Sequence, residues 1–158
     1  MNASPENARR IVVGADGSPG GEEAVSWAIT EAAARGARVE VLLVLPREEL
    51  LPGTSFALQP HGRVPVRDGY SVKEAAERTR AKIDADVPVE ASVRQGNPTS
   101  ELLAAAHGAD LLVLGSPSRK GLERLVFGSV ATACIKHATC PIVLVTPDAV
   151  HRFSPSAS

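Results

Sequence analysis

The segment 115–130, GSPSRKGLERLVFGSV, gathers residue types that bind anions in proteins. It holds three glycines, a basic pair and a serine just before a helical pattern: Gly115, Gly121, Gly128, Arg119, Lys120 and Ser129. Backbone N–H groups at glycine turns and at the start of a helix form a concavity of positive potential, to which a hydroxyl and mobile cations can add. The segment therefore predicts a phosphate cradle, with a strand-to-helix connection carrying solvated cations as the alternative.

Short β-branched runs alternate with longer helical patterns along the chain. We expect strands at 11–15, 39–45, 87–94, 110–115 and 141–146, and helices at about 21–36, 70–83, 99–108 and 128–138. IVVGA is a continuous apolar run, as in a strand buried on both faces, and VEVLLVL is expected to be the second buried strand. The alternation, without a hairpin signal, predicts an α/β domain with an open five-stranded parallel sheet and helices on both faces.

The predicted connections fix where a ligand would bind. Right-handed crossovers give the strand order 3-2-1-4-5, with a switch point between the first and fourth strands. Ligands of open α/β sheets bind outside the carboxyl ends of the strands at such a point. These ends are Asp16-Gly17-Ser18 and Gly115-Ser116, so the segment 115–130 begins at the predicted site.

Composition excludes several classes of function. A net charge of -1 and an aromatic content of 3% argue against a nucleic-acid binder, which needs a basic face and stacking rings. No apolar stretch approaches the length of a membrane span, and the first ten residues lack an apolar leader core, so we expect a cytoplasmic protein. Cys134 and Cys140 have no metal-ligand spacing, and we expect free thiols that pack in the core.

The length of 158 residues fits one domain, which we expect at 10–147 between disordered tails at 1–9 and 148–158. The connection at about 46–71 is rich in proline and glycine and is long for a compact domain. Such connections are usually functional flaps or disordered segments, and we expect a flexible loop.

The spacing of the glycines in the segment 115–130 resembles that of the universal stress protein family. ATP-binding members carry G-x-x-G, nine residues, then G-S or G-T; Gly115 matches the first glycine, Gly128 and Ser129 match the last pair, and Ser118 stands in place of the second glycine. The resemblance runs from about 10 to 147 and includes IVVGADGS, VLLVLP, QGNP and ATCPIVLVTP. It implies a Rossmann-like fold, similar to that of adenine nucleotide alpha hydrolases.

The resemblance also implies a ligand and a role. Members of this kind bind ATP or AMP, with Mg²⁺ as a candidate companion, as a regulatory ligand in a stress response, with at most slow hydrolysis. It places Asp16 and Val44 beside the adenine and ribose. The phosphate positions and their neighbours are Gly17, Ser18, Gly115, Ser116, Ser118, Arg119, Gly128, Ser129 and Val130. Similar proteins form homodimers through the last strand, here about 141–146.

Ser118 is the departure from the family motif. If the family glycine has a positive φ, a Cβ there costs about 1 kcal/mol, and Pro117 removes one N–H donor. The hydroxyl of Ser118 or the cation of Arg119 would offset part of that loss. The alternative function is therefore a dimeric interaction module that has lost the nucleotide. An ATPase is least favoured, because no histidine or paired carboxylate is predicted near Asp16.

Overall fold

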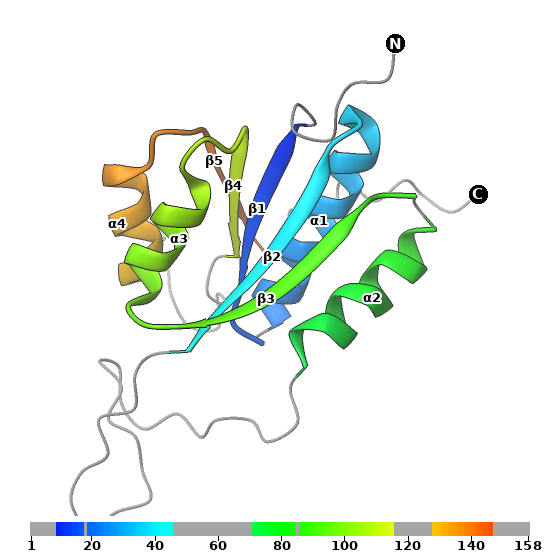
Figure 1. Ribbon diagram of the computed structural model, residues 1–158, viewed down its shortest axis with the longest axis horizontal. Coiled ribbons are helices and arrows are strands. Elements are labelled where there is room, and N and C mark those ends of the chain that lie inside the picture. The colour runs from blue at the N-terminus through cyan, green and yellow to red at the C-terminus, as the bar shows by residue number, and fades with distance from the viewer. Residues whose placement is uncertain (1–8, 18, 46–70, 85, 116–127, 147–158) are drawn as a thin grey trace, which may run out of the picture.

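The computed structural model describes residues 9–17, 19–45, 71–84, 86–115 and 128–146. In these ranges strands and helices alternate in the order β1 (Arg10–Ala15), α1 (Pro19–Arg35), β2 (Arg38–Leu45), α2 (Val72–Ile83), β3 (Val89–Gln95), α3 (Pro98–Ala106), β4 (Leu111–Gly115), α4 (Ser129–His137) and β5 (Ile142–Val145). All pairings are parallel and the order is β3-β2-β1-β4-β5 (Figure 1). The predicted fold class and strand order are confirmed.

Two apolar cores lie on opposite faces of the sheet. In β1, Ile11 and Val13 enter the core covered by α1 and α2, whereas Val12 enters the core covered by α3 and α4. Successive side chains of a strand point to opposite faces, so one buried strand serves both cores. This explains the continuous apolar run of the central strands. The expected tails lie almost wholly outside the described residues, and so does the expected loop at 46–71.

Local sequence sets where the helices begin. Asn97 accepts a hydrogen bond from the N–H of Ser100 at 3.1 Å, and Pro98 occupies the first turn of α3. Ser71 accepts in the same way from Glu74 at the start of α2. These side chains satisfy backbone donors that a helix start leaves without helical partners.

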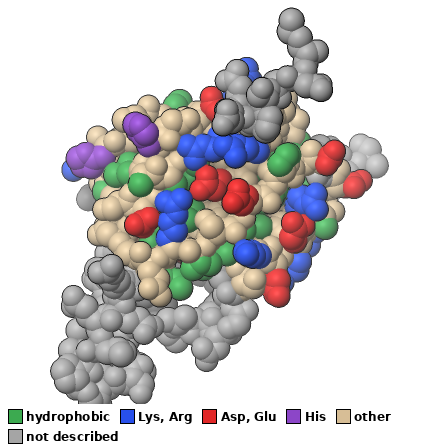
Figure 2. Space-filling view, in the orientation of Figure 1, with side chains coloured by type: hydrophobic (Ala, Val, Ile, Leu, Met, Phe, Trp, Pro, Cys, Tyr) green, Lys and Arg blue, Asp and Glu red, His purple; other side chains and the backbone are tan. Residues whose placement is uncertain are grey.

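Arg10 joins three elements at the amino ends of the strands. Its Nη1 donates to Glu40 Oε2 at 2.9 Å and to the carbonyl of Ala105 at 2.8 Å, and its Nη2 donates to the carbonyl of His107 at 2.8 Å. The guanidinium thereby binds carbonyls at the carboxyl end of α3, where a cation is favoured. Figure 2 shows basic and acidic side chains in contact across the middle of the face viewed.

Replacing Arg10 with alanine should lower the free energy of unfolding by about 2 kcal/mol, because the Glu40 carboxylate and two carbonyls lose a charged donor. Urea denaturation measures the change. The control is Arg35→Ala: Arg35 pairs with Glu31 on the exposed side of α1, with its side chain 57% exposed, and its loss should cost only ~0.5 kcal/mol. Equal effects of the two substitutions would contradict the assigned role of Arg10.

Candidate functional site

The carboxyl ends of β1 and β4 meet at the switch point of the sheet. Gly14 of β1 pairs with Leu114 of β4, one position before each strand ends. After β1 the chain passes through exposed Asp16 and through Gly17, whose φ of 78° lies in the left-handed region that favours glycine. The predicted crevice thus begins with a carboxylate on a tight turn.

Gly115 at the end of β4 packs directly on the first turn of α1. A Cβ built on Gly115 would lie 2.6 Å from the carbonyl carbon of Gly20 and 3.0 Å from the nitrogen of Gly21, and it would come still closer to the carbonyl oxygen of Gly20. These are backbone atoms, which cannot rotate away as a side chain can. The close approach of two backbones is therefore sufficient to require glycine at 115. This contact was not predicted from the sequence, in which Gly20 and Gly21 show only that the first turn of α1 is free of side chains at these positions.

Gly128, the residue before α4, differs from Gly115 in the space around its backbone. Its φ of -57° and ψ of 157° suit any residue, and a Cβ built on it would meet nothing within 4 Å. No side chain caps α4 in the part of the chain that the structure describes, in contrast to the capped starts of α2 and α3. Neither its conformation nor packing against the described residues explains a glycine here.

The first turn of α4 can receive an anion. The backbone N–H of Thr132 donates to the carbonyl of Gly128 at 2.9 Å, and this is the first backbone hydrogen bond of α4. The N–H groups of residues 129–131 belong to the turn before this bond. Ser129 is exposed at this end, and Val130 packs against the core under α3 and α4. Backbone donors, a hydroxyl and the positive end of the helix dipole are thus placed together.

Val44 and Asp16 both lie at the carboxyl edge of the sheet. Ala15 pairs with Leu43, so Asp16 and Val44 occupy the next positions of that register. Val44 is half-buried and packs against the core under α3 and α4, beside Arg94 of β3. The structure therefore places a carboxylate and an apolar side chain at the same edge of the sheet.

Four of the candidate site residues, Ser18, Ser116, Ser118 and Arg119, lie outside the described residues, as do Pro117, Lys120 and Gly121. Within the described ranges no group of three or more His, Cys, Asp or Glu side chains could hold a metal ion. Nor is any described helix long and apolar enough to cross a membrane.

Cys134 and Cys140 are free thiols near the carboxyl end of α4. Cys134 is fully buried, and burial, with a smaller contribution from nearby Cys140, raises the pKa of its thiol above the ordinary value. Burial is also the main cause that raises the pKa of Cys140, which is partly exposed. Both thiols are protonated at neutral pH, as packing residues are expected to be.

These pKa shifts predict slow reaction with a disulfide reagent such as 5,5′-dithiobis(2-nitrobenzoic acid). At pH 7 the native protein should react more slowly than a small thiol, and the rate should rise as the pH is raised, because the thiolate is the nucleophile. Cys140→Ser should remove most of the native-state reaction, since Cys134 stays buried. Rapid labelling at pH 7 would contradict the packing role.

Comparison with known proteins tests the resemblance over nearly the whole chain. The model of the "Universal stress protein family" matches residues 7–146. A universal stress protein of Methanocaldococcus jannaschii is 33% identical over 147 residues, which cover 87% of this chain and 81% of that one. One of Mycobacterium tuberculosis is 30% identical over 143 residues, and the match covers 89% of this chain and 49% of that one. The chain thus spans about half the length of its mycobacterial relatives.

Solved structures give the same fold. A universal stress protein in complex with cAMP is 24% identical, with a TM-score of 0.60 and coverage of 88% of this chain and 97% of that chain. The universal stress protein from Archaeoglobus fulgidus in complex with dAMP is 22% identical, with a TM-score of 0.55 and coverage of 87% and 96%. With the family model matched from before β1 to the end of β5, the chain belongs to the universal stress protein family.

Proposed function

We propose that this protein binds an adenine nucleotide, ATP or AMP, as a regulatory ligand in a cytoplasmic stress response. The observation that carries the proposal is the start of α4, where Gly128 is required neither by its backbone angles nor by contact with the described residues around it. A phosphate close to the backbone N–H groups would supply the missing reason for a glycine. Two relatives of the same fold were solved with cAMP and dAMP, which supports an adenine ligand.

The described residues suit three parts of such a ligand. The exposed carboxylate of Asp16 can accept hydrogen bonds from ribose hydroxyls, and half-buried Val44 on the next strand offers an apolar surface to the base. The first turn of α4, with Ser129, would hold the phosphates.

A binding role fits the described residues better than catalysis. His107 caps the carboxyl end of α3 and His137 is the last residue of α4. Because these helices run antiparallel to the strands they connect, the two described histidines lie at the amino edge of the sheet, opposite Asp16. Asp16 therefore has no described histidine beside it to act as a general base.

Calorimetric titration of the full chain tests the proposal. We expect saturable binding of ATP or AMP, with GTP at equal concentration as the control for base selection. Titrations with and without Mg²⁺ show whether the metal accompanies the nucleotide. Absence of saturable heat with either adenine nucleotide would overturn the proposal and favour the interaction module.

We also propose that the protein forms a homodimer through β5. This strand is at one edge of the sheet, and in the described ranges no strand pairs with its outer side. The unpaired N–H and C=O groups of an edge strand can pair with another chain. Sedimentation equilibrium of the purified protein tests this assembly.

A further inference from the structure

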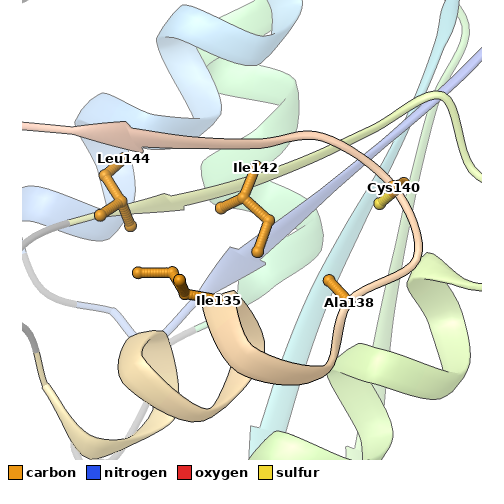
Figure 3. Close-up of a pocket in the computed structure, with 5 residues that line it drawn as sticks. All are labelled: Ile135, Ala138, Cys140, Ile142 and Leu144. Atoms are coloured by element: carbon orange, nitrogen blue, oxygen red, sulfur yellow. The ribbon is translucent and has the colours of Figure 1, made fainter.

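The face of the sheet that α3 and α4 cover is apolar beside β5 and charged beside α3. Between α4 and β5 lies an open hollow with a volume of about 330 Å³, lined by apolar side chains, and Ile135 at its rim is 49% exposed (Figure 3). The part of the face beside α3 instead carries four charged side chains, those of Arg10, Glu40, Arg94 and Glu101. These four form one chain of ion pairs.

The ion pairs alternate in sign and become longer from the first to the last. Arg10 Nη1 lies 2.9 Å from Glu40 Oε2, and Arg94 Nη2 lies 3.6 Å from the other carboxylate oxygen of Glu40. Arg94 Nη1 lies 3.5 Å from Glu101 Oε2. The side chains of the first pair are 19% and 21% exposed, whereas those of Arg94 and Glu101 are 38% and 33% exposed. Arg94 and Glu101 are therefore the open end of the chain, where a ligand can reach them.

This open end lies at the carboxyl edge of the sheet, beside Val44. Arg94 pairs with Val44 in the register of β3 and β2, so their side chains leave the same face of neighbouring strands that lie about 4.8 Å apart. Just beyond this pair, the N–H of Gly96 donates to the carbonyl of Leu45 at 2.9 Å. Glu101 Oε1 lies 3.3 Å from the place that a Cβ on Gly96 would take. The carboxylate of Glu101 is thus held on the turn that follows β3.

We infer that Arg94 and Glu101 select the base of the nucleotide, with Glu101 accepting from the exocyclic amino group of adenine and Arg94 donating to the adjacent ring nitrogen N1. The inference rests on the nucleotide site proposed above and deepens it by assigning base recognition. In that site the ribose is at Asp16 and the base at Val44 of β2, so the far edge of the base faces β3, the next strand. A carboxylate has about four acceptor sites, so the contact with Arg94 does not saturate Glu101.

The two side chains suit adenine because they present an acceptor and a donor side by side. Adenine offers the complement, an amino donor at position 6 beside the acceptor N1. Hypoxanthine, the base of ITP, has an oxygen acceptor at position 6 beside an N–H at N1. In the same pose it would place its oxygen against the Glu101 carboxylate and its N–H against the Arg94 guanidinium, and buried groups left without a partner cost affinity.

Calorimetric titration of the full chain with ATP and with ITP tests this assignment. The wild type should bind ATP at least about tenfold more tightly than ITP, the effect of one hydrogen bond to a charged group. Glu101→Gln keeps the size of the side chain, and its amide can turn an N–H toward the oxygen of hypoxanthine, so this variant should bind both nucleotides about equally. Loss of the ion pair alone would weaken both by the same factor. The ratio of the two dissociation constants therefore separates recognition from a structural role.

Glu90→Gln is the matched control. Glu90 is exposed, lies nearer the amino end of β3 and is on the same face of the strand as Arg94, so its substitution should keep the preference for ATP. Arg94→Met keeps an apolar stem and removes the donors that face N1, so it should lower the preference as Glu101→Gln does. Thermal unfolding shows whether each variant is folded.

A preference for ATP that Glu101→Gln abolishes and Glu90→Gln retains supports the inference. Equal binding of ATP and ITP by the wild type, or an unchanged preference in Glu101→Gln, overturns it and leaves the nucleotide site standing. A preference that survives Arg94→Met overturns the part assigned to Arg94. No saturable heat with either nucleotide overturns the proposed function and this inference together. Gly128→Ala changes the phosphate end only and should weaken ATP and ITP by the same factor.

Discussion

Gly128→Ala should weaken binding of ATP or AMP at least tenfold and leave the fold intact. A methyl group at this position meets no atom of the described residues within 4 Å, and φ of -57° with ψ of 157° is open to alanine. The loss of unfolding free energy should therefore stay within about 1 kcal/mol, the difference between glycine and alanine at a helix N-cap. A phosphate held by the first turn of α4 would meet the added methyl group directly. Calorimetry and urea denaturation of the same preparation measure the two quantities.

The contrast between affinity and stability makes this test specific. Nucleotide affinity equal to that of the wild type would show that no phosphate approaches Gly128, and the proposed site would have to be abandoned. Asp16→Asn serves as a companion, because it keeps the shape of the side chain while removing the charge from the exposed turn after β1. It should weaken ribose recognition more than it changes the free energy of unfolding.

Gly115→Ala should instead destabilise the fold, with a loss of unfolding free energy of about 3 kcal/mol. The new Cβ would lie 2.6 Å from the carbonyl carbon of Gly20, so β4 and the first turn of α1 would have to separate. Overpacking of this kind costs about 1 to 3 kcal/mol, and the upper end applies because both partners are backbone. Urea denaturation of the variant beside wild type gives the value.

Gly128→Ala is the matched control for this substitution, since both changes add one methyl group to a family-motif glycine. Wild-type stability of Gly115→Ala would show that β4 and α1 do not pack as closely as described. Any loss of nucleotide affinity by Gly115→Ala is interpretable only at temperatures where the variant is folded. The two glycines are thus expected to separate a packing role from a ligand role.

The strand order could be predicted because chain order and crossover handedness leave few alternatives. Once the five apolar runs were separated by helical patterns, right-handed connections placed β1 between β2 and β4. The same step located Asp16 and Gly115 at adjoining strand ends, as the pairing of Gly14 with Leu114 confirms. The family resemblance is likewise confirmed by the match over residues 7–146.

Contacts between backbones and the exposure of single side chains could not be predicted. Hydrophobic periodicity shows which face of α1 is buried, but it contains no signal for the distance between Gly20 and Gly115. The motif suggested a phosphate role for Gly115, whereas the structure supplies a packing reason. Ile135 is similar: its exposure depends on where β5 ends the sheet, which is a property of the assembled fold.

If copies of this chain pair through β5 as proposed, the charges on β3 would limit further assembly. A pair joined through β5 would have β3 at both outer ends of a continuous sheet, where Glu90 and Arg94 oppose the addition of another strand. Growth would therefore stop at two copies, because among the described strands only the edge formed by β5, Ile142–Val145, has no charged residue. A sheet with one permissive edge and one resistant edge can form a closed pair without the risk of extending into a fibre.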